Sequence, residues 1–345
     1  MTRTPLWDNA RFLIIVLVVI GHGVQRQGYD SNLAYGVYLL IYSFHMPLML
    51  LLAGWFSREV VDGDRLKRIV SDLIVPYVIF QTIWSVLQWL VSGSRPFDYA
   101  QPKWTLWFLV ALAIMRMLLP ILALLRPWIR WSLVIGVALA CGWWAGVDST
   151  FALSRTLGMM PFFLLGWELA RAGAADPWLS GSRRMVNGIR IAAAGVLIVA
   201  AALAVGSADA LRDFGIHRWF FMDDGYRALG VDEAWAPALR LGLLGVTLVM
   251  SAAFMALVPR RQTGFTAFGQ ATMYVYLLHT FALWPLRESG ILRGAGSDPQ
   301  WVLLVAIGAV LLAVLLSTKP IRTVFRPLVS PRTSWLFRAP TTVRN

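Results

Sequence analysis

The chain has 345 residues, of which 58% are hydrophobic and 14% are charged, and its mean hydropathy is +0.64. A soluble domain is nearer half apolar and a quarter charged, so these values exclude an ordinary soluble enzyme. The formal charge of +13 arises from 28 Arg and three Lys against 18 acidic residues. These basic residues lie in short loops between apolar blocks, which indicates membrane orientation rather than a nucleic-acid partner.

The apolar blocks are long enough to cross a lipid bilayer. A hydrocarbon core of about 30 Å requires roughly 20 helical residues, and inside lipid the backbone polar groups must be satisfied within the helix. We therefore predict an all-α fold, a polytopic transmembrane helical bundle of about ten spans with no separate soluble domain. The predicted spans are 7–26, 33–56, 72–92, 104–122, 131–147, 157–171, 190–206, 240–258, 266–286 and 300–318.

Lys and Arg are distributed unevenly between alternate loops, and this predicts the topology. One set of loops, with both ends of the chain, holds 18 Lys and Arg, and the other set holds about half as many. Because such residues favour the cytoplasm, we expect an inner-membrane protein with both termini cytoplasmic. We expect a transmembrane domain over 1–320 and a basic cytoplasmic tail over 321–345 that lies on anionic lipid. The loops predicted to be cytoplasmic are 57–71, 123–130, 172–190 and 259–265, and those predicted to be outside are 27–32, 93–103, 148–156, 207–239 and 287–299.

Three of the four histidines lie within predicted spans, where ionisable groups are costly and by default functional. At a rise of 1.5 Å per residue, His22 lies roughly 22 Å and His279 roughly 20 Å along two spans of the same direction. These two residues are therefore expected to share a depth, with His45 nearer the middle. Gly21 and Gly23 flank His22 and allow another group to approach it closely.

Each histidine has two open interpretations, a general base or a buried group that hydrogen-bonds a backbone carbonyl. For His22 we favour the general base, because neutral imidazole suits proton abstraction near neutral pH. The sequence has no HxxxH or HxxE spacing, so we expect no metal. A single cysteine, Cys141, excludes a disulfide framework and a zinc cluster within the chain.

Charged residues also cluster at the predicted cytoplasmic ends of the first two spans. Asp8 and Arg11 are three residues apart on one helical face and can form an ion pair. Arg65, Lys67 and Arg68 form a second cluster after the second span. By spacing alone, attachment to anionic lipid is the stronger interpretation of this cluster. Arg guanidinium groups also suit phosphate and diphosphate, so a ligand site is the alternative.

Several short motifs follow one another in a defined order along roughly residues 5–320. They are Trp7-Asp8-Asn9-Ala10-Arg11-Phe12, Gly21-His22, Phe44-His45-Met46-Pro47, Ala53-Gly54-Trp55-Phe56, Arg65-Leu66-Lys67-Arg68, Pro76-Tyr77, Leu106-Trp107-Phe108-Leu109, Pro161-Phe162-Phe163-Leu164-Leu165-Gly166 and Tyr276-Leu277-Leu278-His279. In this order the chain resembles the membrane acyltransferase-3 family, and most closely its fucose 4-O-acetylase-like branch.

The resemblance implies about ten transmembrane helices and transfer of an acyl group, usually acetyl from acetyl-CoA, to hydroxyls of extracytoplasmic carbohydrates. The family's first-span histidine falls on His22 and its nearby arginine on Arg11, while its RxxR arginines fall on Arg65 and Arg68. The expected catalytic residues are His22, Arg11, Asp8, His45 and His279; the expected acyl-CoA-binding residues are Arg65, Arg68 and Arg11; and the expected substrate-binding residues are Trp107, Arg155 and Tyr276.

The expected partners are therefore acyl-CoA, a carbohydrate or glycolipid acceptor, and membrane lipid. The alternative function is a transporter or flippase of lipid-linked sugars. In such a protein the intramembrane histidines would relay protons and the arginine clusters would anchor lipid.

Overall fold

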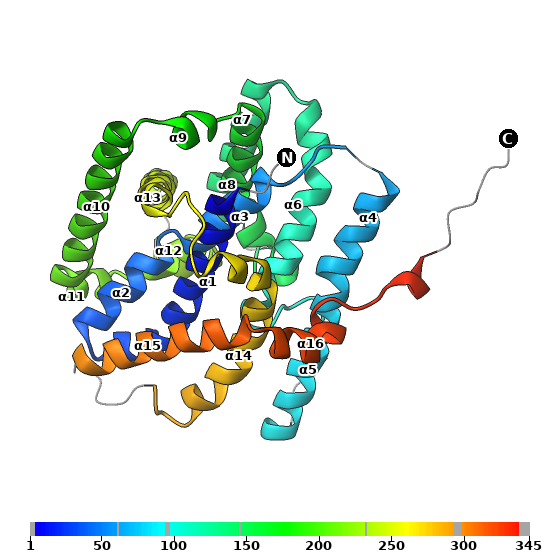
Figure 1. Ribbon diagram of the computed structural model, residues 1–345. Coiled ribbons are helices and arrows are strands. Elements are labelled where there is room, and N and C mark those ends of the chain that lie inside the picture. The colour runs from blue at the N-terminus through cyan, green and yellow to red at the C-terminus, as the bar shows by residue number, and fades with distance from the viewer. Residues whose placement is uncertain are drawn as a thin grey trace, which may run out of the picture.

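The computed structural model describes residues 4–60, 62–93, 97–144, 146–231, 233–292 and 299–337. In these ranges the chain forms helices and loops without a strand (Figure 1). The α-helices are α1 (Pro5–Val24), α2 (Asn32–Tyr42), α3 (His45–Trp55), α4 (Gly63–Ile69), α5 (Val75–Ser92), α6 (Trp107–Leu124), α7 (Pro127–Ala140), α8 (Leu153–Arg171), α9 (Asp176–Ser180), α10 (Arg183–Gly206), α11 (Ala208–Asp213), α12 (Ile216–Phe221), α13 (Ala236–Leu257), α14 (Thr272–Glu288), α15 (Pro299–Leu316) and α16 (Lys319–Val329). Short helices of 3-10 type, and the π-helical η2, are η1 (Gln27–Tyr29), η2 (Val70–Ile74), η3 (Trp104–Leu106), η4 (Cys141–Trp143), η5 (Thr150–Ala152), η6 (Arg227–Leu229), η7 (Thr266–Ala271) and η8 (Ser334–Leu336).

A helix lies at each of the ten predicted spans. Among the described residues, seven helices or joined helices are long and apolar enough to cross a membrane. They are Pro5–Val24, Asn32–Trp55, Gly63–Val91, Trp104–Leu124, Arg183–Gly206, Ala236–Leu257 and Pro299–Leu316. The other three predicted spans correspond to α7, α8 and α14. Of these, α7 and α14 have 14 and 17 residues, and α8 carries Arg155, Glu168 and Arg171. The all-α membrane fold is confirmed.

The second predicted span differs from the sequence prediction because it is not one continuous helix. The chain leaves helical geometry between α2 and α3, where Phe44 has φ −146° and ψ −20°. Pro47 gives the physical reason: it lacks an N–H, and in a continuous helix its ring would clash with the carbonyl of Ser43. The freed Ser43 carbonyl accepts a hydrogen bond from Thr247 Oγ1 at 2.7 Å. A neighbouring helix thus satisfies the broken backbone, as the lipid environment requires.

Helices α3 and α8 approach each other closely enough to bring their backbones into contact. A Cβ atom at Gly54 would lie 1.9 Å from the Phe163 carbonyl oxygen, and one at Gly166 would lie 1.9 Å from the Leu51 oxygen. Only glycine allows this separation, since those contacts are far inside van der Waals distance. The close packing of α3 against α8 holds the wall of the candidate site described below.

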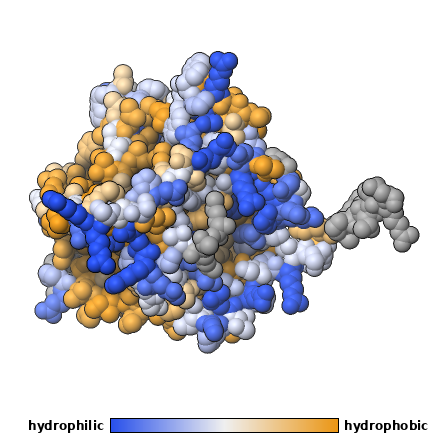
Figure 2. All heavy atoms as spheres, turned by 45° about the horizontal axis from the view of Figure 1, so that its top comes forward, coloured by the Kyte–Doolittle hydropathy of each residue, from blue (hydrophilic) through white to orange (hydrophobic). Residues whose placement is uncertain are grey.

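Some segments that the sequence assigned to opposite sides of the membrane lie far apart in the bundle. The turn between α6 and α7 and helix α9 lie at the top of Figure 1, whereas the C-terminal end of α14 lies at the bottom. In Figure 2, where that top end comes forward, hydrophilic residues gather over the middle and right of the face, with hydrophobic residues along its left flank. Which end faces the cytoplasm stays a prediction.

The boundary predicted at residue 320 falls inside helix α16. This helix packs on the bundle through Val329, which is buried. Beyond the helix, the Thr333 hydroxyl lies 2.7 Å from the Ser71 hydroxyl in η2, within hydrogen-bond distance. The first part of the predicted tail is therefore ordered against the domain, while its residues 338–345 lie outside the described ranges.

Candidate active site

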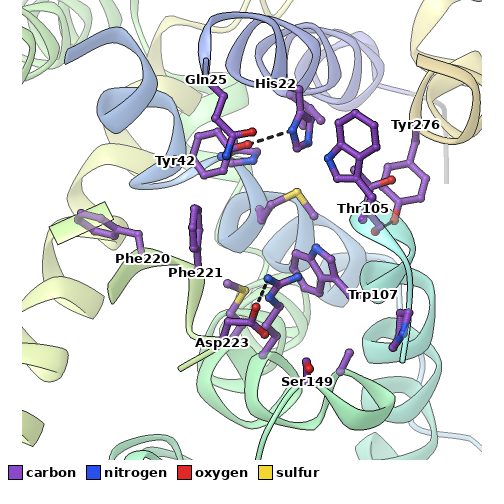
Figure 3. A pocket seen from close by; sticks show the side chains of 18 of the residues that line it. His22, Gln25, Tyr42, Thr105, Trp107, Ser149, Phe220, Phe221, Asp223 and Tyr276 are labelled. Atoms are coloured by element: carbon purple, nitrogen blue, oxygen red, sulfur yellow. Dashed lines mark hydrogen bonds and ion pairs between the residues drawn. The ribbon is translucent and has the colours of Figure 1, made fainter. Parts of the chain in front are cut away.

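A cavity of about 430 Å³ opens between the end of α1, the α2–α3 break, η3, and the start of α8. We call it the histidine cavity. Its polar lining comes from segments far apart in the sequence, and Figure 3 shows these side chains converging on one space. The polar and aromatic residues that line it are His22, Gln25, Tyr42, His45, Gln101, Trp104, Thr105, Trp107, Ser149, Arg155, Phe220, Phe221, Asp223, Tyr276 and Arg287.

His22 lies at the centre of this arrangement and is partly exposed to the cavity. Its Nδ1 is 3.0 Å from the Tyr42 hydroxyl, drawn as a dashed line in Figure 3. A Cβ at Gly21 would lie 3.0 Å from a ring carbon of Tyr42, so the expected close approach beside His22 is confirmed. When Nδ1 carries the proton and donates it to the Tyr42 oxygen, Nε2 keeps the lone pair that a general base needs.

The other two intramembrane histidines are also close, although they make different contacts. The rings of His22 and His279 are 5.4 Å apart between centroids, which confirms their shared depth. Nδ1 of His279 lies 2.8 Å from the Val275 carbonyl oxygen, and its buried Nε2 has no hydrogen-bond partner among the described residues. His45 begins α3 and its Nδ1 lies 2.8 Å from the Ile41 carbonyl oxygen, at the end of α2. His45 therefore stabilises the helix break as well as lining the cavity.

Arg155 lies on the opposite wall and is held by two residues of distant segments. Its Nη2 donates to a carboxylate oxygen of Asp223, and its guanidinium lies 4.7 Å from the ring centroid of Trp107. Figure 3 shows Trp107 and Asp223 on the side of the cavity that faces His22. The structure thus brings Arg155 and Trp107, both expected to bind substrate, side by side in the wall of this cavity.

The backbone around the histidine cavity is strained. Trp104, Phe151, Ala152 and Met222 have φ between 48° and 54°, in the left-handed region that L-residues with side chains seldom adopt. Trp104 and Ala152 line the cavity, and the other two adjoin lining residues. Among the described residues these are the non-glycine positions with positive φ. Such strain typically clusters at functional sites, where surrounding contacts hold it in place.

A second cavity of about 440 Å³, the arginine cavity, lies along α1, α3, α6 and α14. Arg11 and Arg116 supply its charged lining, and most of the remaining lining is apolar. The two cavities share three lining residues, Val18, Met46 and Tyr276. Tyr276 donates its hydroxyl hydrogen to the Thr105 carbonyl oxygen, which fixes its ring at this junction. The two cavities therefore adjoin at these three residues, and we refer to the pair, from the arginines to His22, as the passage.

At the arginine end, the predicted Asp8–Arg11 pair is present with an N–O distance of 3.9 Å. Asp8 is buried, and the Arg11 guanidinium also lies 4.3 Å from the Phe56 ring centroid. Asp8 lies beside Arg11 and does not itself line either cavity.

Arg65 and Arg68, which are expected to bind acyl-CoA, do not line the histidine cavity or the arginine cavity. Arg65 donates to the backbone carbonyls of Arg58, Val60 and Arg116. Arg68 Nε donates to the Asp64 carbonyl at 3.3 Å. The contact of Arg65 with the Arg116 backbone ties the loop after α3 to α6. Both side chains act electrostatically on the Arg116 guanidinium, together with Arg11 and Asp72.

Similarity to a known protein family shows where this chain belongs. The sequence model of a family described as an acyltransferase domain, acyltransferase-3, matches residues 6–318. The chain belongs to this acyltransferase family. Membership of this family, together with the apolar helices, favours an enzyme over the transporter that the histidines also suggested.

Two relatives of this chain are nodulation proteins. Nodulation protein NolL of Sinorhizobium fredii is 26% identical over 187 residues, which is 49% of this chain and 49% of that protein. Nodulation protein NolL of Mesorhizobium japonicum is 26% identical over 187 residues, which is 49% of this chain and 48% of that protein. The chain thus spans about half the length of the curated relatives it matches. No solved structure matches it.

Sequence reasoning about this chain missed three residues of the two cavities. Arg116 lies inside the predicted fourth span, and the rule that found the histidines identifies it as well. Tyr42 and Asp223 carry no such signal, because a tyrosine in a span and an aspartate in an outer loop are ordinary. Only the tertiary structure brings them to His22 and Arg155.

Proposed function

We propose that this membrane acyltransferase moves an acetyl group from cytoplasmic acetyl-CoA to a hydroxyl of a carbohydrate or glycolipid acceptor on the other side of the inner membrane. The observation that carries the proposal is the passage formed by the arginine and histidine cavities, which meet at Val18, Met46 and Tyr276. A passage of this kind lets a cytoplasmic donor reach an acceptor that never enters the cytoplasm.

The arginine cavity suits the donor. Coenzyme A carries phosphates at one end and a flexible pantetheine arm at the other. Arg11 and Arg116 line the cavity, with the positive charges of Arg65 and Arg68 nearby. Guanidinium groups bind phosphate well, so we place the phosphates at this end, which would then be the cytoplasmic one with both chain termini. The pantetheine arm lies along the apolar lining, with the thioester towards Tyr276.

The histidine cavity suits the transfer step. His22 Nε2 takes the proton of the acceptor hydroxyl as the hydroxyl oxygen attacks the thioester carbon. The carbonyl oxygen becomes an oxyanion, for which Arg155 is the proposed donor because its Nε makes no hydrogen bond to another described residue. The carbon–sulfur bond then breaks, and the thiolate of coenzyme A receives the proton from His22. The products are the O-acetylated acceptor and coenzyme A.

The acceptor is proposed to be a carbohydrate because the histidine cavity combines aromatic rings with hydrogen-bonding groups. Trp104 and Trp107 offer ring faces, while Gln25 and Gln101 offer amides. Placement in the fucose 4-O-acetylase-like branch agrees with such an acceptor and is part of the proposal. The helix break near His45 resembles those of transporters, but its freed carbonyl is bound by Thr247 and is not available to an ion.

Proteoliposomes with the protein in one orientation test the proposal. Radiolabelled acetyl-CoA is supplied on the Arg116 side and a panel of neutral glycans on the other, and label transfer and thiol release are measured. We expect transfer in this arrangement and none when the two sides are exchanged. Transfer only when donor and acceptor share one side would refute the passage, and thiol release without any glycan product would refute the carbohydrate acceptor. Val18→Phe, which fills the junction, should abolish transfer while preserving coenzyme A binding.

A further inference from the structure

A third cavity, of about 470 Å³, adjoins the histidine cavity on the far side of Asp223. We call it the tryptophan cavity, after Trp143 and Trp144 in its wall. Asp223 lines both cavities. The neighbouring residues Asp148 and Ser149 face different cavities: Asp148 lines the tryptophan cavity, and Ser149 lines the histidine cavity. The two cavities are therefore adjacent, with only the width of a side chain between them. An extended molecule would be able to reach from one cavity into the other.

The aromatic side chains of the tryptophan cavity are unusually open. Trp143 is 53% exposed and Trp144 is 70% exposed, although both are large and apolar. Trp143 is held edge-on against Tyr226, with centroids 5.4 Å apart and an interplanar angle of 77°. A ring that is oriented from one side and open on the other is a flat apolar surface. The C–H face of a sugar ring packs on such a surface.

The carboxylates of the same cavity are held in place by the protein. Asp148 Oδ1 accepts a hydrogen bond from the Thr150 backbone N–H at 2.7 Å. Asp224 Oδ2 accepts two from Arg218, at 3.1 and 2.8 Å. Hydrogen bonds from Thr150 lower the pKa of the Asp148 carboxyl, so this group is ionised and accepts hydrogen bonds from hydroxyls. Its side chain needs no large rearrangement when a ligand arrives.

A membrane anchor and a cation site would each account for this lining less well than a sugar does. Tryptophans that only anchor a protein in the membrane interface have no need of carboxylates in the same cavity. A cation site needs several ligands around one point, yet in the described ranges no group of three or more His, Cys, Asp and Glu side chains is arranged to hold a metal ion. Exposed aromatic faces beside ionised hydrogen-bond acceptors are the combination that recognises a sugar ring.

We propose that the tryptophan cavity binds a second sugar unit of the acceptor, next to the unit whose hydroxyl is acetylated in the histidine cavity. The inference rests on the proposed carbohydrate acceptor and extends it, because the substrate becomes an oligosaccharide or a glycolipid with more than one sugar. Asp223 lies between the two units. Trp144 and Asp148 determine the preference for a second sugar without contacting the reacting atoms.

Direct binding without any acyl donor tests this subsite. The probes are fluorescently labelled neutral mono-, di- and trisaccharides of glucose, galactose, fucose and N-acetylglucosamine. We expect at least one disaccharide to bind the parent roughly 2- to 12-fold more tightly than its monosaccharide, the range of one aromatic contact. Trp144→Ala should remove this gain, Trp144→Phe should restore part of it, and Asp148→Asn should reduce it.

Trp235→Ala is the matched control, because Trp235 is 47% exposed, lies in the predicted outer loop 207–239 and lines none of the described cavities. It should keep the full gain. Equal binding of mono- and disaccharides by the parent, no binding at all, or a gain that survives Trp144→Ala would overturn the subsite. Because the assay needs no acyl transfer, a protein that binds disaccharides but transfers nothing would refute the enzymatic proposal alone.

Discussion

The two halves of the passage have nearly the same volume, about 430 and 440 Å³, but their linings differ. The histidine cavity has two histidines, two arginines and an aspartate in its wall, on a strained backbone. The arginine cavity is mostly apolar and has its charge in Arg11 and Arg116. We infer from this difference that acyl transfer takes place in the histidine cavity and that the arginine cavity holds the long acyl donor. Substitutions in the first half should therefore change turnover, and those in the second should change donor affinity.

The largest effect is expected for His22→Asn. Asn keeps a polar side chain at this position but cannot accept a proton near neutral pH. Turnover should fall by roughly 10²–10⁴, the usual contribution of a positioned base. Thermal stabilisation by coenzyme A should stay at the parent level, because the arginine cavity is unchanged. The measurement is acetyl transfer per folded molecule, with stabilisation recorded on the same preparation.

His217→Asn is the control for the loss of a histidine. His217 lies in α12 and lines none of the described cavities, although its ring packs against Tyr35 and Phe221. Its substitution should leave turnover within a few-fold of the parent. If His22→Asn also stays within a few-fold, the base lies elsewhere and His279 is the next residue to test.

The second effect is expected for Arg116→Met, which keeps an unbranched side chain and removes the charge. A hydrogen bond to a charged group contributes about 1.5–3 kcal/mol, so the KM for acetyl-CoA should rise roughly 10- to 150-fold. The kcat should change much less. Arg126→Met, at an exposed position before α7, removes a charge from the same end of the bundle and should leave the KM unchanged. A fall in kcat alone would contradict the division between the halves.

The sequence predicted the all-α membrane fold and the neighbourhood of His22 and His279, because helical rise and hydropathy are local properties. It did not predict the contacts of Arg65, because one of the three carbonyls that this side chain binds, that of Arg116, lies 51 residues away along the chain. The continuous span at 33–56 was also wrong in detail, although Pro47 in the sequence indicates the break. Pairing of Arg155 with Asp223, 68 residues apart, is a tertiary property that no local pattern encodes.

The third prediction is that substitutions of Arg65 and Arg68 have different effects, although both residues have the same expected role in the RxxR motif. Arg65→Ala should lower the unfolding free energy by about 1 kcal/mol, because water replaces its carbonyl contacts only in part. It should raise the KM for acetyl-CoA only a few-fold, through loosening of the Arg116 backbone. Arg68→Ala should change both quantities less. The measurements are the thermal midpoint and the donor KM. A rise in KM for Arg68→Ala as large as that for Arg116→Met would place the phosphates in the loop instead.

The smallest effect is expected for Tyr42→Phe, which removes one hydroxyl and leaves the ring in place. This hydroxyl is the 3.0 Å partner of His22 Nδ1, and orientation of the imidazole depends on it. A neutral hydrogen bond contributes about 0.5–1.5 kcal/mol, so kcat should fall roughly 2- to 12-fold while the donor KM is unchanged. Tyr38→Phe is the control, since the Tyr38 ring lies tilted against that of Tyr42, with centroids 4.2 Å apart, and does not line the histidine cavity. In the His22→Asn background, Tyr42→Phe should have no further effect, because its influence acts through that imidazole. Independent, additive losses in the double variant would show that Tyr42 contacts substrate instead of orienting the base.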